Sequence, residues 1–256
     1  MRSALFIVES QNYNKIAVVG DIHGDYRILD AILKFVDLNR DLLIFLGDYA
    51  DRGPFGVETI RNVARLKEDY PKNVIALKGN HEDFTETGEP KFRPCTIINE
   101  VKTKIGSWDD FFKKELKPFI DNLQLSALIP NNALLVHGGV SRKLSKIDNL
   151  MFPSEQLKED ILWSDPFNGK GERRNRERGV GIEFGADITS YVCNTLGVGR
   201  IIRSHQPERA MIKPSYVHED RVITVHSTTM YGGLPFVFFV GTSSSKNDHY
   251  KNIQKL

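Results

Sequence analysis

Three short apolar runs in the first third of the chain each end in a glycine followed by a polar residue. The segments are GDIHG (20–24), GDYADRG (47–53) and GNHE (79–82), about thirty residues apart. Apolar residues recur at helical spacing between them, which gives strand, helix, strand, helix, strand. This is the pattern of a parallel sheet with helices on its faces. We therefore expect these Asp, His and Asn side chains to gather at the carboxyl edge of one sheet.

The rest of the chain continues as a mixed α/β pattern without an internal repeat. The expected strands cover residues 15–20, 42–46, 73–77, 133–136 and 200–204, with further sheet, in parallel or antiparallel pairing, at 221–226 and 234–240. The expected helices follow Tyr26 and Gly53 and cover 107–129, 156–162 and 186–196, and residues 84–106 are expected to be a loop with some helix. We expect one domain over residues 1–256, ending in a polar, solvated tail at about 242–256.

Two later apolar runs end in histidine, ALLVH and IIRSH, so five strand ends carry a metal-ligand type. Any one of them alone would be a turn former or cap, but five in one chain favour a metal site. The candidate ligands are Asp21, His23, Asp48, Asn80, His137 and His205. Oxygen and imidazole ligands without thiolate suit manganese, iron or zinc. Two divalent ions about 3.5–4 Å apart need a carboxylate between them, and Asp48, in the central motif, is the candidate bridge.

The same motifs carry residues suited to catalysis. His81 directly follows Asn80, so we expect its side chain to diverge from the metals toward the substrate. Asp51 would orient the ring and raise its pKa, which makes His81 a candidate general acid. The alternative interpretation is a salt bridge between two turns. Arg52 offers a planar, charged donor for a phosphoryl group.

Composition narrows the classes of function. The formal net charge of +2 argues against binding nucleic acid or a membrane surface. Cys95 and Cys193 have no CxxC partner, which excludes a disulfide scaffold or a zinc finger. No apolar run approaches the roughly 20 residues of a membrane helix, and the N-terminus lacks a small-residue cleavage site. We expect a cytoplasmic protein, and nothing in the sequence indicates its oligomeric state.

Taken in order, these motifs resemble the PPP family of metal-dependent serine/threonine protein phosphatases. They are GDIHGD, GDYADRG, YPKNVIALKGNHE, HGG, WSDP, RGVGIEFG and RSHQ, and they run from residue 20 to residue 206. The resemblance implies an α/β metallophosphoesterase fold, with a central β-sandwich of mixed sheets flanked by helices. The short segment before Asp21 resembles compact archaeal or bacterial members, and residues 226–230 depart from the eukaryotic pattern, so inhibitor sensitivity is not expected to carry over.

The family resemblance also implies roles for single residues. Asp21, His23 and Asp48 would hold the first metal, and Asp48, Asn80, His137 and His205 the second. Arg178 would bind phosphate, and Asp165 and Tyr231 would lie near the cleft. Arg203 precedes His205 in the chain, and we expect it to brace the site instead of binding phosphate. The remaining basic residues of 170–178 are expected to form a solvated loop, with docking of acidic phosphoproteins as the alternative.

The sequence thus predicts a phosphatase that acts on phosphoserine and phosphothreonine in proteins. A metal-bridging hydroxide would attack phosphorus in line, Arg52 and Arg178 would hold the equatorial oxygens, and His81 would protonate the leaving oxygen. A dinucleoside polyphosphate hydrolase shares the GDIHG-type start but typically lacks the aspartate at position 51 and carries GNHD. A catalytically silent phosphoprotein-binding module is the third possibility. It is disfavoured because every metal-ligand position of the family is filled in this sequence.

Overall fold

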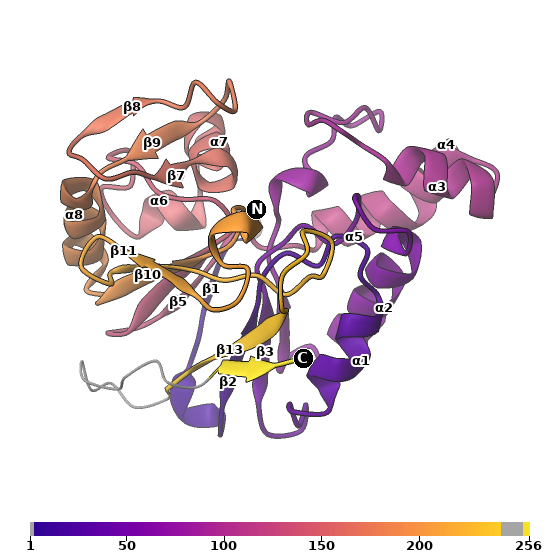
Figure 1. Cartoon of the computed structure of the whole chain (residues 1–256), viewed down its shortest axis with the longest axis horizontal. Helices are drawn as coiled ribbons and strands as arrows, with labels where there is room; N and C mark the ends of the chain where they lie inside the picture. Colours follow the sequence, from indigo (N-terminus) through magenta and orange to yellow (C-terminus); the bar gives the residue numbers. More distant parts are fainter. Residues whose placement is uncertain (1–2, 242–252) are drawn as a thin grey trace.

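The computed structural model describes residues 3–241 and 253–256. Two mixed β-sheets pack face to face, and helices cover the outer face of each sheet (Figure 1). This confirms the expected β-sandwich flanked by helices. Within the described residues, no helix is both long and apolar enough to cross a membrane.

The first sheet has the order β14-β13-β2-β3-β4. Its strands are β2 (Ile16–Val19), β3 (Leu42–Phe45), β4 (Val74–Ala76), β13 (Phe236–Val240) and β14 (Ile253–Lys255). Strands β2, β3 and β4 are parallel, as the three glycine motifs predicted, and β13 is antiparallel to both β2 and β14.

The second sheet has the order β1-β5-β6-β10-β12-β11. Its strands are β1 (Leu5–Ile7), β5 (Ser126–Ile129), β6 (Ala133–Val136), β10 (Arg200–Arg203), β11 (Ser215–Val217) and β12 (Val222–Thr224). Strands β6, β10 and β12 are parallel neighbours, so His137 and His205 follow two adjacent strands at the same edge. A small third sheet joins β7 (Asp165–Pro166), β9 (Ile182–Phe184) and β8 (Glu172–Arg174).

The helices form two groups (Figure 1). The first sheet is covered by α1 (Arg27–Leu33), α2 (Gly56–Asp69), α3 (Ile97–Lys104), α4 (Trp108–Phe111) and α5 (Lys117–Asp121), with a π-helical turn at Phe112–Leu116. The second sheet is covered by α6 (Asp148–Met151), α7 (Glu155–Trp163) and α8 (Ala186–Leu196). Short 3-10 helices lie at Ser10–Asn12, Asn80–Glu82 and Pro207–Arg209.

Strand β2 shows why these runs are continuously apolar. Ile16 and Val18 belong to the core between the two sheets, whereas Ala17 and Val19 belong to the core under helices α1–α5. All four side chains are fully buried because successive residues of a strand point to opposite faces. A strand of this kind cannot shift its register without exposing apolar surface, so its carboxyl end is fixed in place.

Two sequence expectations need correction. The helix expected over 107–129 ends at Asp121, and Ser126–Ile129 is strand β5, which pairs with β6 and β1. The sequence pattern did not assign β1 to any element. Residues 242–252 of the expected tail lie outside the described part, but Ile253–Lys255 pairs with β13 rather than extending into solvent. Each difference comes from a pairing between segments that are distant in sequence.

Candidate metal and catalytic site

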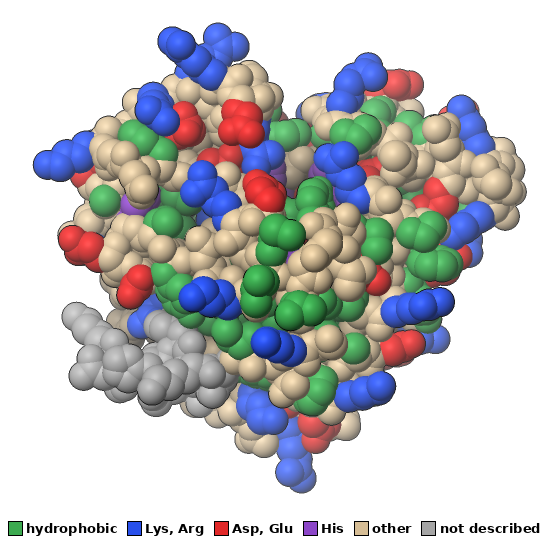
Figure 2. Space-filling view, in the orientation of Figure 1, with side chains coloured by type: hydrophobic (Ala, Val, Ile, Leu, Met, Phe, Trp, Pro, Cys, Tyr) green, Lys and Arg blue, Asp and Glu red, His purple; other side chains and the backbone are tan. Residues whose placement is uncertain are grey.

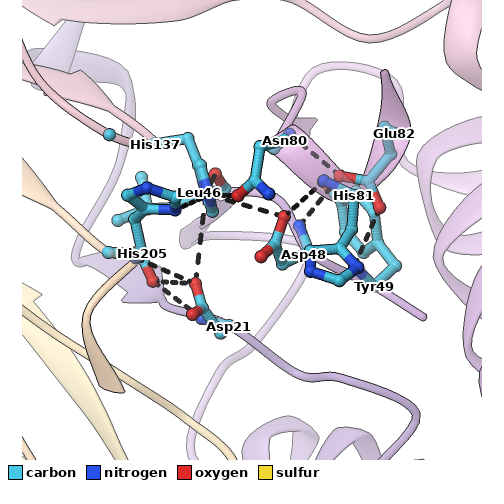
Figure 3. Close-up of polar contacts among 12 residues, drawn as sticks. Asp21, Leu46, Asp48, Tyr49, Asn80, His81, Glu82, His137 and His205 are labelled. Atoms are coloured by element: carbon cyan, nitrogen blue, oxygen red, sulfur yellow. Dashed lines mark hydrogen bonds and ion pairs between the residues drawn. The ribbon is translucent and has the colours of Figure 1, made fainter. Parts of the chain in front are cut away.

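Five strand ends meet at one place, and they come from both sheets (Figure 3). Asp21, Asp48 and Asn80 follow β2, β3 and β4, whereas His137 and His205 follow β6 and β10. All five side chains are buried. The structure therefore brings together the residues that the sequence singled out, at the edge where the two sheets converge.

The backbone at this edge adopts an uncommon conformation. His23, Asp48, Asp51, Arg52 and His205 have φ angles between +50° and +69°, in the left-handed region that non-glycine residues seldom adopt. Each such residue costs about 1–3 kcal/mol and persists only where the surrounding structure holds it. Strain of this kind concentrates at functional sites, and here five of the residues proposed from the sequence carry it.

His137 lies at the centre of one group of ligand atoms. Its Nδ1 donates to the carbonyl oxygen of Leu46 at 3.0 Å, which leaves Nε2 with a free lone pair. That Nε2 lies 2.9 Å from Asn80 Oδ1, 3.2 Å from His205 Nδ1 and 3.4 Å from Asp48 Oδ1. Imidazole, amide and carboxylate donors converging in this way fit a borderline or hard divalent cation.

His23 forms a second group on the other side of Asp48. Its Nδ1 donates to the carbonyl of Ala50 at 3.0 Å, and its Nε2 lies 3.5 Å from Asp48 Oδ2 and 3.7 Å from Asp21 Oδ2. Asp21 Oδ2 is buried and has no hydrogen-bond partner, so a cation would supply its missing interaction. His81 also brings a ligand atom within 4.8 Å of those of His23 and Asp48.

Asp48 contributes a different oxygen to each group. Oδ2 faces His23 and Oδ1 faces His137, which is the arrangement that a carboxylate bridging two metals requires. The central position of Asp48 in the sequence motifs had suggested the bridging role. Its two oxygens have the orientation that this role needs.

The charges and burial of these side chains also favour bound metal cations. Burial lowers the pKa of His23 to about 4 and that of His137 to about 3, so both rings are neutral and can act as ligands near pH 7. Burial, together with the nearby charges of Asp21 and Glu82, raises the pKa of Asp48 well above its usual value. Buried carboxylates this close together are costly to ionise without positive charge between them, and two divalent ions would supply it.

Asp51 and His81 form a buried pair beside the ligands. Asp51 Oδ2 lies 2.7 Å from His81 Nδ1, and Oδ1 accepts the backbone N–H groups of Thr96 at 2.5 Å and Ile97 at 2.8 Å. Burial alone would lower the pKa of His81, but the charges of Asp48 and Asp51 outweigh it and raise that pKa. The raised pKa favours the protonated ring, and Asp51 orients it, which suits a general acid.

Glu82 is a site residue that the sequence pattern did not single out. Its Oε2 accepts the N–H groups of Asp48 and Gly79, both at 2.9 Å, and its Oε1 accepts that of Tyr49 at 3.0 Å. One carboxylate therefore joins the GDYADRG and GNHE loops. The loops lie so close that a Cβ on Gly47, where φ is +110°, would come within 2.3 Å of the Gly79 nitrogen. The only signal in the sequence was the glutamate that ends GNHE.

Ser204 is a second such residue, and it supports Asp21. Its hydroxyl donates to Asp21 Oδ1 and accepts the Asp21 N–H at 2.8 Å, while the His205 N–H also donates to Asp21 Oδ1 at 3.1 Å. The residue before one ligand thus orients another ligand from the opposite sheet. This contact spans 183 residues of sequence, so no local pattern could have indicated it.

Asp165 organises the arginines on one side of the site. Its Oδ2 accepts Nε of Arg178 at 2.5 Å, and its Oδ1 accepts Nη2 of Arg203 at 2.9 Å. Arg203 is fully buried and also donates to Gln206 at 2.7 Å, so it braces the site as expected. Arg178 is half-buried and donates from Nη2 to the His205 carbonyl at 3.1 Å, which places its guanidinium beside a candidate metal ligand.

Arg52 approaches from the other side. It lies in the loop that contains Asp51, its side chain is exposed, and it hydrogen-bonds the hydroxyl of Tyr231. That hydroxyl lies 3.4 Å from His23 Nε2, and burial raises the pKa of Tyr231 to about 12. Figure 2 shows histidine side chains at the bottom of a notch between two lobes, with Lys and Arg side chains on both rims. Arg52 thus lies near the His23 group, through Tyr231, whereas Arg178 lies near the His205 group.

A family model described as calcineurin-like phosphoesterase matches residues 14–209. That range includes every candidate metal ligand and the candidate catalytic residues Asp51, Arg52, His81 and Arg178, but not Tyr231. The chain belongs to this family. Its members use a dinuclear divalent metal site, and the two groups of ligand atoms that share Asp48 fit such a site.

Two relatives from Caenorhabditis elegans are similar in sequence. A putative serine/threonine-protein phosphatase, C06A1.3, is 33% identical over 245 residues, which cover 90% of this chain and 64% of the relative. Serine/threonine-protein phosphatase C23G10.1 is 33% identical over 199 residues, which cover 75% of this chain and 42% of the relative. This chain therefore matches less than two thirds of the length of each.

Among solved structures, a serine/threonine phosphatase from Saccharomyces cerevisiae with similarity to human phosphatase PP5 has a TM-score of 0.80 and 25% identity. The match covers 99% of this chain and 84% of that one. Two further solved structures share the fold. A putative diadenosine tetraphosphatase has a TM-score of 0.61 and 14% identity, and the match covers 100% of this chain and 98% of that one. A cold-active protein-tyrosine phosphatase of a Shewanella species has a TM-score of 0.63 and 18% identity, and the match covers 99% of this chain and 82% of that one.

Proposed function

We propose that this chain is a metal-dependent phosphatase that hydrolyses phosphoserine and phosphothreonine in proteins. The observation that carries the proposal is the Asp51–His81 pair beside two ligand groups joined by Asp48. The names of the two C. elegans relatives and of the yeast structure support a protein substrate.

The ligands divide into two overlapping sets. Asp21, His23 and Asp48 would hold one ion, and Asp48, Asn80, His137 and His205 the other. When bound, two divalent ions lower the pKa of a shared water to about 7 and so supply hydroxide at neutral pH. Manganese, iron and zinc all suit these donors.

The remaining steps belong to protein side chains. Arg52, next to Tyr231, and Arg178, next to the His205 carbonyl, would hold the phosphoryl oxygens and so orient phosphorus for in-line displacement. His81 would then protonate the leaving serine or threonine oxygen, with Asp51 fixing the ring. No side-chain nucleophile is needed, so we expect no covalent phosphoenzyme.

The alternatives have less support. The putative diadenosine tetraphosphatase shares only the fold at 14% identity, whereas Asp51, which such hydrolases typically lack, is in place beside His81. A catalytically silent binding module would need neither the complete set of metal-ligand side chains nor a histidine paired with a carboxylate as a general acid. We further propose that residues 1–256 form one catalytic domain and that the protein acts on phosphoproteins in the cytoplasm.

The test is phosphate release from a phosphothreonine peptide and from diadenosine tetraphosphate, using chelator-stripped protein with and without manganese. We expect manganese-dependent turnover of the peptide and little of the dinucleotide. Asp48→Asn is the matched variant, because it should lose both manganese binding and turnover. Preference for the dinucleotide would move the function to nucleotide hydrolysis, and silence on both substrates would favour the binding module.

A further inference from the structure

A cationic segment borders the candidate site next to Arg178. Residues 170–178 hold five Lys or Arg and two Glu. Arg173 is neutralised, because it binds Glu183 at 2.8 and 3.1 Å and its guanidinium stacks on Phe167 at 4.1 Å. Arg178 is held by Asp165. The other three cations of the segment are Lys170, Arg174 and Arg176.

Lys170, Arg174 and Arg176 are exposed, and their side chains have no hydrogen bond or ion pair within residues 3–241 and 253–256. Glu172 accepts the backbone N–H of Arg142 at 2.5 Å and keeps its negative charge, because that donor is neutral. Glu177 is the one acidic side chain of the segment that has no partner in the described chain. Lys170, Arg174 and Arg176 against Glu172 and Glu177 leave an excess of one positive charge, and none of the three cations is bound in an ion pair within the described residues.

Asn175 holds this segment in place. It is buried between Arg174 and Arg176, and its Nδ2 donates to Asp165 Oδ2 at 3.0 Å, the same oxygen that accepts Nε of Arg178. Its Oδ1 accepts the Arg178 N–H at 3.2 Å. A merely solvated loop needs no such anchor. The exposed arginines are therefore fixed relative to the arginine that faces the site.

The distances of Arg174 and Arg176 from Arg178 match the distances between neighbouring residues of an extended peptide. Arg176 is two residues and Arg174 four residues from Arg178, so along the chain they lie at most about 7 Å and about 14 Å away. An extended peptide rises about 3.3 Å per residue. Side chains within about four positions of a phosphorylated residue held by Arg178 can therefore reach both arginines.

We infer that Lys170, Arg174 and Arg176 form a docking surface for acidic residues that flank the phosphorylated residue of a protein substrate. The inference rests on the proposed phosphatase function. Arginine binds carboxylates through two parallel hydrogen bonds, and unpaired arginines beside a phosphate site offer this interaction without first breaking another. A nucleic-acid ligand is less favoured, because the chain as a whole carries a net charge of only +2.

The experiment compares phosphothreonine peptides that share a core and carry either glutamate or glutamine at the flanking positions, on the N-terminal or the C-terminal side. The measured quantity is the ratio of kcat/KM for acidic and neutral peptides with the manganese-loaded protein. For the native chain we expect a ratio of about 3 to 10 on at least one side, falling as salt is added. In Arg174→Glu/Arg176→Glu the ratio should fall to about 1 or below.

The matched control is Lys34→Glu/Lys72→Glu, which makes the same change in net charge. Both lysines are exposed and unpaired in the described residues, and they lie at the end of α1 and before β4, on the edge opposite the site. This variant should keep the native ratio. Equal turnover of acidic and neutral peptides by the native chain would overturn the docking surface alone. Hydrolysis of p-nitrophenyl phosphate without any peptide turnover would overturn the proposed function and this inference with it.

Discussion

His81 Nδ1 lies 2.7 Å from the Asp51 carboxylate, and both side chains are buried. Burial alone would raise the pKa of Asp51, but the hydrogen bond and charge of His81, together with two backbone N–H groups on the other oxygen, outweigh it and keep that pKa below its usual value. An ionised carboxylate can only accept, so Nδ1 must carry the proton. The pair therefore fixes the tautomer and orientation of the ring, which the proposed acid role requires.

Replacing His81 with Asn should lower kcat for a phosphoserine peptide about 10²- to 10⁴-fold, with metal content unchanged. The loss should be much smaller for p-nitrophenyl phosphate, because p-nitrophenolate leaves without needing a proton. Steady-state kinetics on both substrates and elemental analysis provide the measurement. An equal loss on the two substrates would remove His81 from the acid role.

Arg178→Lys should reduce kcat/KM about 10- to 100-fold and weaken inhibition by inorganic phosphate, because lysine cannot hold Asp165 and phosphate together through a planar fork. Asp165→Asn should show a similar loss, since it releases Arg178. Arg173→Lys is the control: that exposed arginine pairs with Glu183, and its change should stay within about twofold. Normal phosphate inhibition in Arg178→Lys would argue against a role for Arg178 in binding phosphate.

Glu82→Gln should lower the free energy of unfolding by about 2–4 kcal/mol, because an amide nitrogen would face N–H groups that now share a carboxylate. Manganese affinity should fall as well, since the Asp48 and Asn80 loops would separate. Urea denaturation and metal titration are the measurements. Glu159→Gln, at an exposed position in α7, should change stability by less than about 0.5 kcal/mol. If the two variants behave alike, Glu82 does not hold the loops.

Cys95 should resist alkylation in the native protein. Burial and the nearby Asp51 charge raise the pKa of its thiol to about 12, so at pH 8 only about one molecule in 10⁴ carries the reactive thiolate. Iodoacetamide should therefore modify native Cys95 at least about a hundredfold more slowly than the urea-unfolded chain, and faster as the pH rises. Mass spectrometry after timed quenching measures both rates. Similar rates in the two states would contradict the raised pKa.

Much of the candidate site was predictable because its candidate ligands follow strands that can themselves be predicted from the sequence. An apolar run of four or five residues that ends in glycine marks a buried strand and its carboxyl end together. The positions of Asp21, Asp48 and Asn80 at one sheet edge therefore follow from three local patterns. Helix α8, over Ala186–Leu196, matched its predicted range for a similar reason, because its apolar spacing is local.

Other features depended on contacts between distant segments. Strand β5 was mistaken for the end of a helix, because its apolar residues extend the preceding pattern and only pairing with β1 and β6 makes them a strand. Strand β14 was assigned to a solvated tail for lack of a long apolar run, yet β13 supplies its hydrogen bonds. The secondary structure of such short segments is decided by the strands with which they pair, and a local pattern does not contain those strands.

The sequence by itself determined which side chains could bind metal and phosphate, because residue type sets ligand chemistry and strand ends set their approximate place. Only the tertiary structure decided how those side chains are held. Glu82 bonded to Asp48, Ser204 bonded to Asp21, and Asn175 and Arg178 sharing Asp165 are all contacts between loops of separate strands. Such contacts depend on how neighbouring strands and sheets are placed relative to one another, and that geometry arises from the whole core rather than from any one segment.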